Sequence, residues 1–275
     1  MQRRCSPPTV FALVCAVFIL SVIACNPSSD GPELPPQGSM TVDVGAFKAV
    51  NVPGKTDRMT GSKSHAAAAW KRVAWLNTSV VLALAPPRLA LHAALSQRPK
   101  FSRGAWSWLF SVRSGINTLA ADLTGKFGNN AEVGSDLDLE MRVTCTACKG
   151  STNNFKWYTG RFDSKERSGQ WQLFNPEISQ EDKTFVHIAW KITDPTHKVL
   201  TFTNKRTDGH PDAGDIIHYE RDGDRLSVTV HDANKKLDYT AEVSVSTHVG
   251  WLRVPDYNKG ERACWDDKRV NTPCM

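Results

Sequence analysis

Apolar and polar residues alternate in one segment after another beyond residue 105. This pattern predicts β-strands, because successive side chains of a strand point to opposite faces. The cleanest example is 136–145, where Leu137, Leu139, Met141 and Val143 alternate with charged and hydroxyl side chains. About eleven segments follow this pattern and are predicted as strands: 105–113, 119–124, 136–145, 155–162, 170–174, 184–192, 199–203, 215–221, 225–230, 237–246 and 249–254.

Short polar connections join these segments, and Asp222-Gly223-Asp224 is a typical hairpin turn. No helical pattern separates successive strands. The sequence therefore predicts a mainly β fold, an antiparallel up-and-down meander over residues 100–275. An open sheet of this many strands curls and leaves its edges exposed. We expect it to close into a barrel, of which a lipocalin-like barrel is one form, or to fold over on itself.

A helical pattern precedes the strands, in residues 65–99. One apolar stripe with helical spacing runs from Ala66 to Leu76, and a second apolar run extends from Leu89 to Leu95. Pro86-Pro87 lies between them, and a proline suits the first turn of a helix, where its missing N–H costs nothing. The pattern predicts two short helices, with a strand at 79–85 as the alternative.

The chain begins like a secreted bacterial protein. Arg3 and Arg4 precede a short apolar run, an arrangement that predicts a signal peptide over residues 1–24. The run ends in Val22-Ile23-Ala24-Cys25, which resembles the bacterial lipobox. That resemblance implies that Cys25 is lipidated and holds the mature protein to a membrane through acyl chains. An ordinary cleaved signal or an uncleaved anchor helix is the alternative.

The residue after the cysteine is Asn26, where lipoproteins retained in the inner membrane often carry aspartate. This favours the outer membrane of the cell envelope. Residues 25–64 then contain many Pro, Ser and Gly and few apolar side chains. Such a composition cannot offset the entropy of ordering by burial, so this segment is predicted to be a flexible tether.

Seven cysteines reduce to four that can form structural bonds, because Cys5 and Cys15 lie in the signal peptide and Cys25 takes the lipid. The four are Cys145, Cys148, Cys264 and Cys274. An even number in an oxidising compartment predicts disulfides. We favour Cys264 with Cys274, which would hold the C-terminal tail, and Cys145 with Cys148. A four-cysteine zinc site and a thioredoxin-like redox motif are the alternatives.

Polar clusters on predicted strands offer two candidate sites, each of which also fits an ordinary solvated surface. His218 and His231 are predicted to share one strand face with Thr229, where two imidazoles could bind a metal. The carboxylates of strand 136–145 share a face as well, and paired carboxylates can hydrolyse glycosides. They are Asp136, Asp138 and Glu140.

We expect no cofactor, with calcium as the one possibility that the sequence suggests. Oxygen ligands gather in the glycine-containing loop 207–215, which holds Asp208, His210, Asp212 and Asp215. Residues 256–261 also resemble the start of a calcium-binding loop. Neither segment has the spacing of an EF-hand, and turns of this composition form without metal.

All nine tryptophans follow residue 64, and several take the apolar side of a predicted strand. Four of them are candidates to line a ligand cavity: Trp106, Trp108, Trp157 and Trp190. The alternative is that they fill the core, since aromatic side chains bury the largest area per residue.

The formal net charge is +6 and falls to +4 when Arg3 and Arg4 leave with the signal. No Lys/Arg-rich run of the kind that contacts nucleic acid is present, so we expect no nucleic-acid partner. The common nucleotide-binding and hydrolase motifs are missing too.

Three C-terminal segments resemble a set of uncharacterised bacterial lipoproteins: 154–160, 251–258 and 260–266. The resemblance implies a lipidated, β-rich envelope protein and no known activity. We expect a non-catalytic β-domain that binds an apolar ligand, a glycan or a protein. An envelope hydrolase and a purely structural lipoprotein are the alternatives.

Cys25→Ser should move the protein from the detergent phase to the aqueous phase in a phase-separation assay, because it removes the acyl chains. Cys15→Ser, within the signal, should leave the partition unchanged. An unmodified Cys25 in the mass spectrum of the mature wild-type protein would contradict the lipidation prediction.

Overall fold

The computed structural model describes residues 31–48, 64–114, 117–128, 136–146, 152–174, 184–207 and 209–274. The predicted signal peptide, Cys25 and Cys148 lie outside these residues. The described strands are β1 (Lys100–Ser102), β2 (Ala105–Ser114), β3 (Asn117–Phe127), β4 (Asp136–Thr146), β5 (Thr152–Asp163), β6 (Ser168–Phe174), β7 (Thr184–Asp194), β8 (His197–Asn204), β9 (Ile216–Asp222), β10 (Arg225–Asp232), β11 (Leu237–Ser244), β12 (Gly250–Arg253), β13 (Ala263–Trp265) and β14 (Asn271–Thr272).

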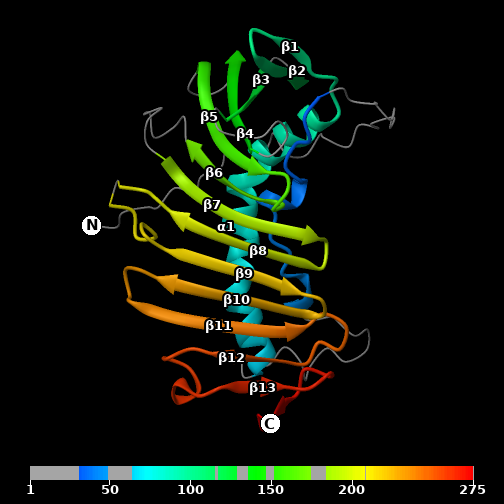
Figure 1. Cartoon of the computed structure of the whole chain (residues 1–275). Helices are drawn as coiled ribbons and strands as arrows, with labels where there is room; N and C mark the ends of the chain where they lie inside the picture. The colour runs from blue at the N-terminus through cyan, green and yellow to red at the C-terminus, as the bar shows by residue number, and fades with distance from the viewer. Residues whose placement is uncertain are drawn as a thin grey trace, which may run out of the picture.

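These strands form one antiparallel sheet in which each strand pairs with the next strand of the chain, from β1 to β14. The predicted meander is therefore confirmed. The described strands β1 and β14 stand at opposite ends of the sheet and do not pair with each other, so the sheet is folded over and not closed into a barrel (Figure 1). The three strands that were not predicted, β1, β13 and β14, have two or three residues each.

One helix, α1 (His65–Leu95), occupies the segment predicted as two short helices. The Ser64 side chain caps its start by accepting a hydrogen bond from the Ala67 N–H at 3.0 Å. The helix continues through Pro86-Pro87, so the predicted break and the alternative strand at 79–85 are both wrong. Packing overrides the two missing N–H donors, because Leu84 and Leu91 on either side of the prolines are buried.

Helix α1 crosses the strands and covers one face of the sheet, the inner face (Figure 1). It contacts β2 and β3 at one end of the stack and β12 and β13 at the other. Its 31 residues extend about 46 Å, and nine strand spacings, from β3 to β12, extend about 43 Å. The helix is thus as long as the sheet that it covers. Within the described part of the chain, no helix combines the length and apolarity needed to span a bilayer.

Residues 31–48, here called the strap, also pack on the inner face. The strap contains two single-turn 3-10 helices, η2 (Gln37–Met40) and η3 (Gly45–Phe47). Its buried apolar side chains are Leu34, Met40, Val42, Val44 and Phe47. The flexible tether predicted for residues 25–64 is therefore wrong over 31–48, where five apolar residues hidden among Pro and Gly join the core.

Side chains from the sheet hold the middle of the strap by hydrogen bonds. Trp171 Nε1 donates to Ser39 Oγ at 3.1 Å, and Lys198 Nζ donates to a strap carbonyl, that of Thr41, at 3.2 Å. The Tyr219 hydroxyl donates to the Asp43 carbonyl at 3.3 Å. Burial under the strap lowers the pKa of Lys198. These bonds satisfy buried polar groups that the apolar packing alone would leave unpaired.

The C-terminal tail ties down both N-terminal segments. The disulfide between Cys264 and Cys274 is present as predicted, and it closes a loop that contains Arg269 and Asn271. The Arg269 guanidinium donates to the carbonyls of Ala46 and Phe47, both at 3.1 Å. Asn271 Oδ1 accepts from the first N–H of α1, that of His65, at 2.7 Å. Cys145 is also disulfide-bonded, and its predicted partner Cys148 is outside the described residues.

Tryptophans on the inner face lie flat over glycines of the neighbouring strand. The register pairs Gly160 with Trp171, Gly169 with Trp190 and Gly250 with Trp265. A Cβ on Gly169 would come within 2.7 Å of the Trp190 ring, and one on Gly160 would collide with Trp171. Because glycine has no side chain, each indole can lie over the glycine of the adjacent strand. The side-chain layer on the inner face is therefore thin enough for α1 to pack closely on the sheet.

Gly160→Ala should destabilise the protein by about 1–3 kcal/mol, because the new methyl group overlaps a fully buried indole that has no room to move. Urea unfolding followed by tryptophan fluorescence measures the change. The matched control is Gly128→Ala, whose Cβ would stay 3.8 Å from its nearest neighbour. Equal stability of the two variants would contradict this account of the inner face.

Cys274→Ser should lower the free energy of unfolding by about 2–3 kcal/mol, since it opens a ten-residue loop. Amide exchange should also speed up at the end of the strap and the start of α1, which the loop holds, while β9 and β10 stay protected. Reduction of the wild type should reproduce both effects. Unchanged exchange at Phe47 and His65 would show that the disulfide does not support these contacts.

Candidate functional site

The outer face of the sheet, opposite α1, is covered with polar side chains. One row crosses five strands, because the register pairs each member with the next. From β4 to β8 it consists of Asp138, Arg161, Gln170, Ala189 and Thr201. Apolar positions of the same strands point inward, as the alternation predicts.

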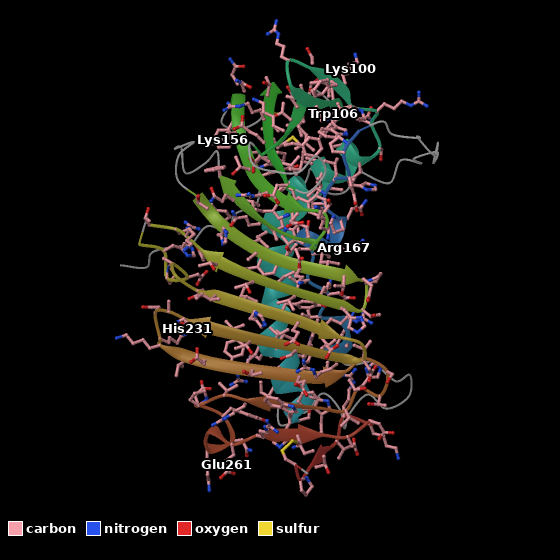
Figure 2. All side chains as sticks on the ribbon, viewed as in Figure 1. Lys100, Trp106, Lys156, Arg167, His231 and Glu261 are labelled. Atoms are coloured by element: carbon pink, nitrogen blue, oxygen red, sulfur yellow. A yellow bond between two sulfur atoms is a disulfide. The ribbon has the colours of Figure 1, made fainter. Side chains whose placement is uncertain are left out.

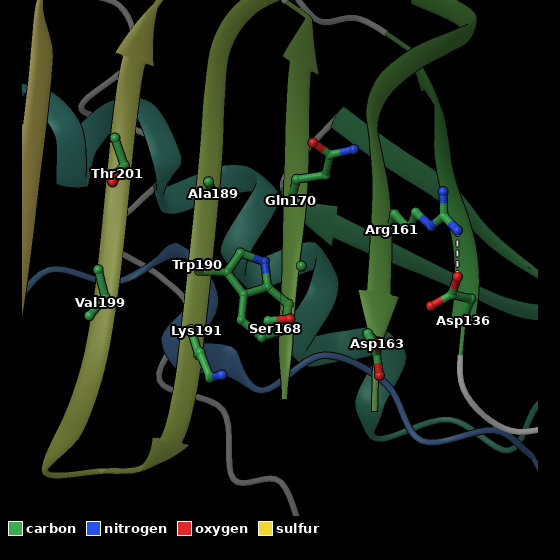
Figure 3. Close-up of a pocket in the computed structure, with 11 residues that line it drawn as sticks. Asp136, Arg161, Asp163, Ser168, Gln170, Ala189, Trp190, Lys191, Val199 and Thr201 are labelled. Atoms are coloured by element: carbon green, nitrogen blue, oxygen red, sulfur yellow. Dashed lines mark hydrogen bonds and ion pairs between the residues drawn. The ribbon is translucent and has the colours of Figure 1, made fainter. Parts of the chain in front are cut away.

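Two open hollows lie along this part of the outer face, with volumes of about 540 and 630 Å³. They share Arg161 and Gln170 and are therefore treated together, from β3 to β8, as the trough; Figure 3 shows the first hollow. The first hollow is lined by Asp136, Arg161, Asp163, Ser168, Gly169, Gln170, Ala189, Trp190, Lys191, Val199 and Thr201. The second is lined by Thr124, Lys126, Phe127, Gly128, Asp138, Leu139, Glu140, Thr159, Gly160, Arg161, Gln170 and Gln172.

Side-chain size explains why the outer face is hollowed here. Ala189 stands between Gln170 and Thr201 in the row, and its methyl group fills less space than either neighbour. Figure 3 shows the longer side chains of Gln170 and Lys191 on the neighbouring positions, with Arg161 beyond Gln170 and reaching toward Asp136. Substrate or ligand groups could therefore reach the β7 backbone region between polar side chains.

Ion pairs and hydrogen bonds position the polar groups of the trough. Arg161 pairs with Asp136, and this carboxylate, with Asp138 nearby, raises the pKa of the guanidinium. The Gln170 amide oxygen lies 3.1 Å from Nε2 of His187. Burial, and next to it the charge of Lys205, lowers the pKa of His187, so this imidazole is neutral at pH 7 and can donate to the amide oxygen.

The trough thus offers acceptors, donors and both signs of charge along one part of the outer face. Carboxylates of β4 accept hydrogen bonds, the guanidinium of Arg161 donates them, and the amides of Gln170 and Gln172 do both. One aromatic side chain, Phe127, lines the second hollow and is 37% exposed. The register pairs Phe127 with the buried Leu137, so this ring only borders the hollow. The arrangement suits a hydroxyl-rich or zwitterionic ligand.

The four tryptophans predicted as ligand-lining residues pack in the core, and one of them, Trp190, also borders the first hollow. Trp108 and Trp190 are buried, and Trp190 stacks on Phe162 with ring centroids 5.6 Å apart. Trp106 and Trp157 are half-buried and pack against the same core. The alternative weighed for them, core filling, is correct, because α1 and the strap occupy the inner face where a ligand cavity would lie.

The two histidines share one face with Thr229, as predicted, but each is engaged elsewhere. His218 Nδ1 lies 3.1 Å from Thr201 Oγ1, and His231 Nδ1 lies 2.6 Å from Asp238 Oδ1. Over the ranges that the structure describes, no group of three or more His, Cys, Asp or Glu residues is arranged to hold a metal ion.

The predicted calcium-type loops have structural contacts instead. Asp208 lies outside the described residues, and His210 lies 3.5 Å from the Asp212 carboxylate. Asp215 Oδ1 accepts from the Ala233 N–H at 2.9 Å, and burial raises the pKa of this carboxyl. In the second segment Asp256 forms an ion pair with Arg72 at 3.4 Å.

The carboxylates Asp136, Asp138 and Glu140 do share the outer face, and all three line the trough. Sequence reasoning found this row but not its neighbours Arg161 and Gln170. These residues come from other strands, and only the register of β4, β5 and β6 brings them alongside. The hairpin turn between β5 and β6 carries that information in the sequence, since a known turn length fixes the pairing.

Comparisons of this chain with protein-family models, with curated proteins and with solved structures gave no match, so the candidate site rests on the geometry of the trough alone.

Proposed function

We propose that the protein is a lipid-anchored protein of the bacterial cell envelope whose β-domain binds a glycan in the trough without transforming it. The observation that carries the proposal is the trough itself, two adjoining hollows that cross β3 to β8 and are lined by hydrogen-bonding side chains. The signal-like N-terminus and the lipobox resemblance support the anchored, envelope part of the proposal.

Sugar chemistry matches the side chains of the trough. Each sugar hydroxyl both donates and accepts a hydrogen bond, so it needs acceptors such as Asp138 and donors such as Arg161 within reach of one another. Carboxylate and guanidinium groups also make the stronger, charge-assisted bonds.

An elongated ligand fits this trough better than a compact one. The trough crosses several strands, and neighbouring strands are about 4.8 Å apart, so a ligand following it would run across the sheet for roughly 20 Å or more. That length accommodates several linked sugar units. An apolar ligand finds less support, because the apolar inner face is filled by α1 and the strap.

Arg161→Ala should weaken binding of envelope glycan about tenfold, since it removes a charge-assisted donor from the centre of the trough. The probes are purified peptidoglycan sacculi in a co-sedimentation assay and soluble envelope polysaccharide in calorimetry. Little stability should be lost, because the ion pair with Asp136 is at the surface.

The matched control is Arg253→Ala, an exposed arginine at the far end of the same outer face, opposite Thr240 of β11 and beyond the trough. This variant should bind as the wild type does. If the wild type binds neither probe, or if both arginine variants lose affinity equally, the glycan-binding proposal is wrong.

A further inference from the structure

Positive charge without negative charge accumulates in the part of the chain that forms α1, β1 and β2. Residues 64–114 contain seven Lys and Arg residues and no Asp or Glu. Three of these cations lie close together in the sequence at the end of the sheet: Arg98, Lys100 and Arg103. All three are exposed, and Figure 2 shows Lys100 at the extreme end of the molecule.

Carboxylate partners are missing around these three cations. Several cations on the body of the sheet do pair with carboxylates, such as Arg142 with Glu140 and Arg225 with Glu220, both at 2.6 Å. Within the described part of the chain, Arg98, Lys100 and Arg103 form no ion pair. Their charge is therefore free to act on a partner.

One exposed aromatic side chain stands among these cations. Phe101, between Lys100 and Arg103 in the sequence, is 60% exposed, the largest exposed fraction of any large apolar side chain in the described ranges. It packs beside Trp106, with ring centroids 5.0 Å apart, so the strand pair presents an aromatic group at its end. Leu109 is also exposed, but the register places it on the opposite face of the pair, across from Asp122. We call Arg98, Lys100, Phe101 and Arg103 the hairpin patch.

The start of the strap places the membrane anchor beside this patch. Gly31, the first described residue, packs so closely on Pro99 that a Cβ there would collide with the proline ring. Pro99 directly precedes Lys100. Cys25 is six residues before Gly31, a distance of about 20 Å at full extension. A lipid on Cys25 therefore holds the bilayer within reach of the hairpin patch.

We propose that the hairpin patch rests on an anionic phospholipid bilayer and so orients the sheet on the membrane. Lys and Arg attract the negative surface of the bilayer, and Phe101 enters the boundary between headgroups and acyl chains. An exposed aromatic group flanked by cations is the composition expected at such a boundary. The position of the anchor is part of the proposed function, whereas the charge and exposure of the patch are independent of it.

Amide hydrogen exchange on the mature protein bound to vesicles tests this proposal. Vesicles of phosphatidylcholine are compared with vesicles in which about one third of the lipid is phosphatidylglycerol. Exchange of the amides of residues 98–109 should slow at least about fivefold on the anionic vesicles only, and high salt should reverse the effect.

Two charge-reversal variants, one in the patch and one elsewhere on the surface, change the net charge equally. Comparing them separates the effect of the patch from general electrostatics. Lys100→Glu/Arg103→Glu should abolish the protection, and Phe101→Ser should reduce it with no change of charge. The matched control is Lys236→Glu/Lys268→Glu, which alters two exposed lysines on the β10–β11 turn and in the tail. It should leave the protection intact.

Flotation with neutral vesicles reports separately on the lipid at Cys25. A protein that fails to float with neutral vesicles lacks the anchor, yet protection on anionic vesicles would still support the patch. Equal exchange of residues 98–109 on both kinds of vesicle would overturn the inference. So would equal loss of protection in the two charge-reversal variants.

Discussion

The apolar inner face of a fourteen-stranded open sheet must be covered, and every other feature of this fold depends on how that is done. A closed barrel would bury such a face by itself. Here the sheet stays open, and a helix as long as the stack of strands lies across it. The indoles that lie over glycines make this cover possible, because they fill the inner face without raising it. The strap then covers the strip beside the helix.

Because the inner face is used for the core, the surface left open to a ligand is the outer face and the ends of the sheet. The outer face provides a polar trough where Ala189 interrupts a row of longer side chains. The end of the sheet at β1 and β2 provides a different chemistry, an exposed aromatic group among unpaired cations. The two surfaces are therefore separated in position and in the ligands that they suit, one polar and one amphipathic.

The strands could be predicted from the sequence because a period of two is a local signal, and eleven of the fourteen described strands carry it. The two residues of β14 are too few to show it. The strap was missed because its regular alternation, Met40, Val42 and Val44, covers only three positions and lies among residues typical of linkers. The break predicted at Pro86-Pro87 is wrong for a related reason. Helix propensity is a local property of the sequence, whereas the burial of Leu84 and Leu91, which keeps the helix continuous, is a property of the assembled fold.

For the candidate site, the sequence revealed the carboxylates of β4 but not the residues beside them. Alternation assigns Asp136, Asp138 and Glu140 to one face, and it says nothing of lateral neighbours. Arg161 reaches Asp136 only because β5 pairs in one particular register. The same limit applies to the tryptophans, since Trp108 and Trp190 would look identical in sequence whether they lined a cavity or packed under a helix.

The tail loop also has a consequence for how the chain folds. Each strand pairs with its predecessor, so the sheet can grow from contacts between near neighbours in the sequence, which form quickly. The contacts that fasten its cover join distant residues: His65 to Asn271 across 206 positions, and Phe47 to Arg269 across 222. A chain that folds as it is synthesised, from the N-terminus onward, can therefore form these bonds only after the loop from Cys264 to Cys274 has been made. Until then α1 and the strap are held to the sheet by apolar packing without the hydrogen bonds of Arg269 and Asn271.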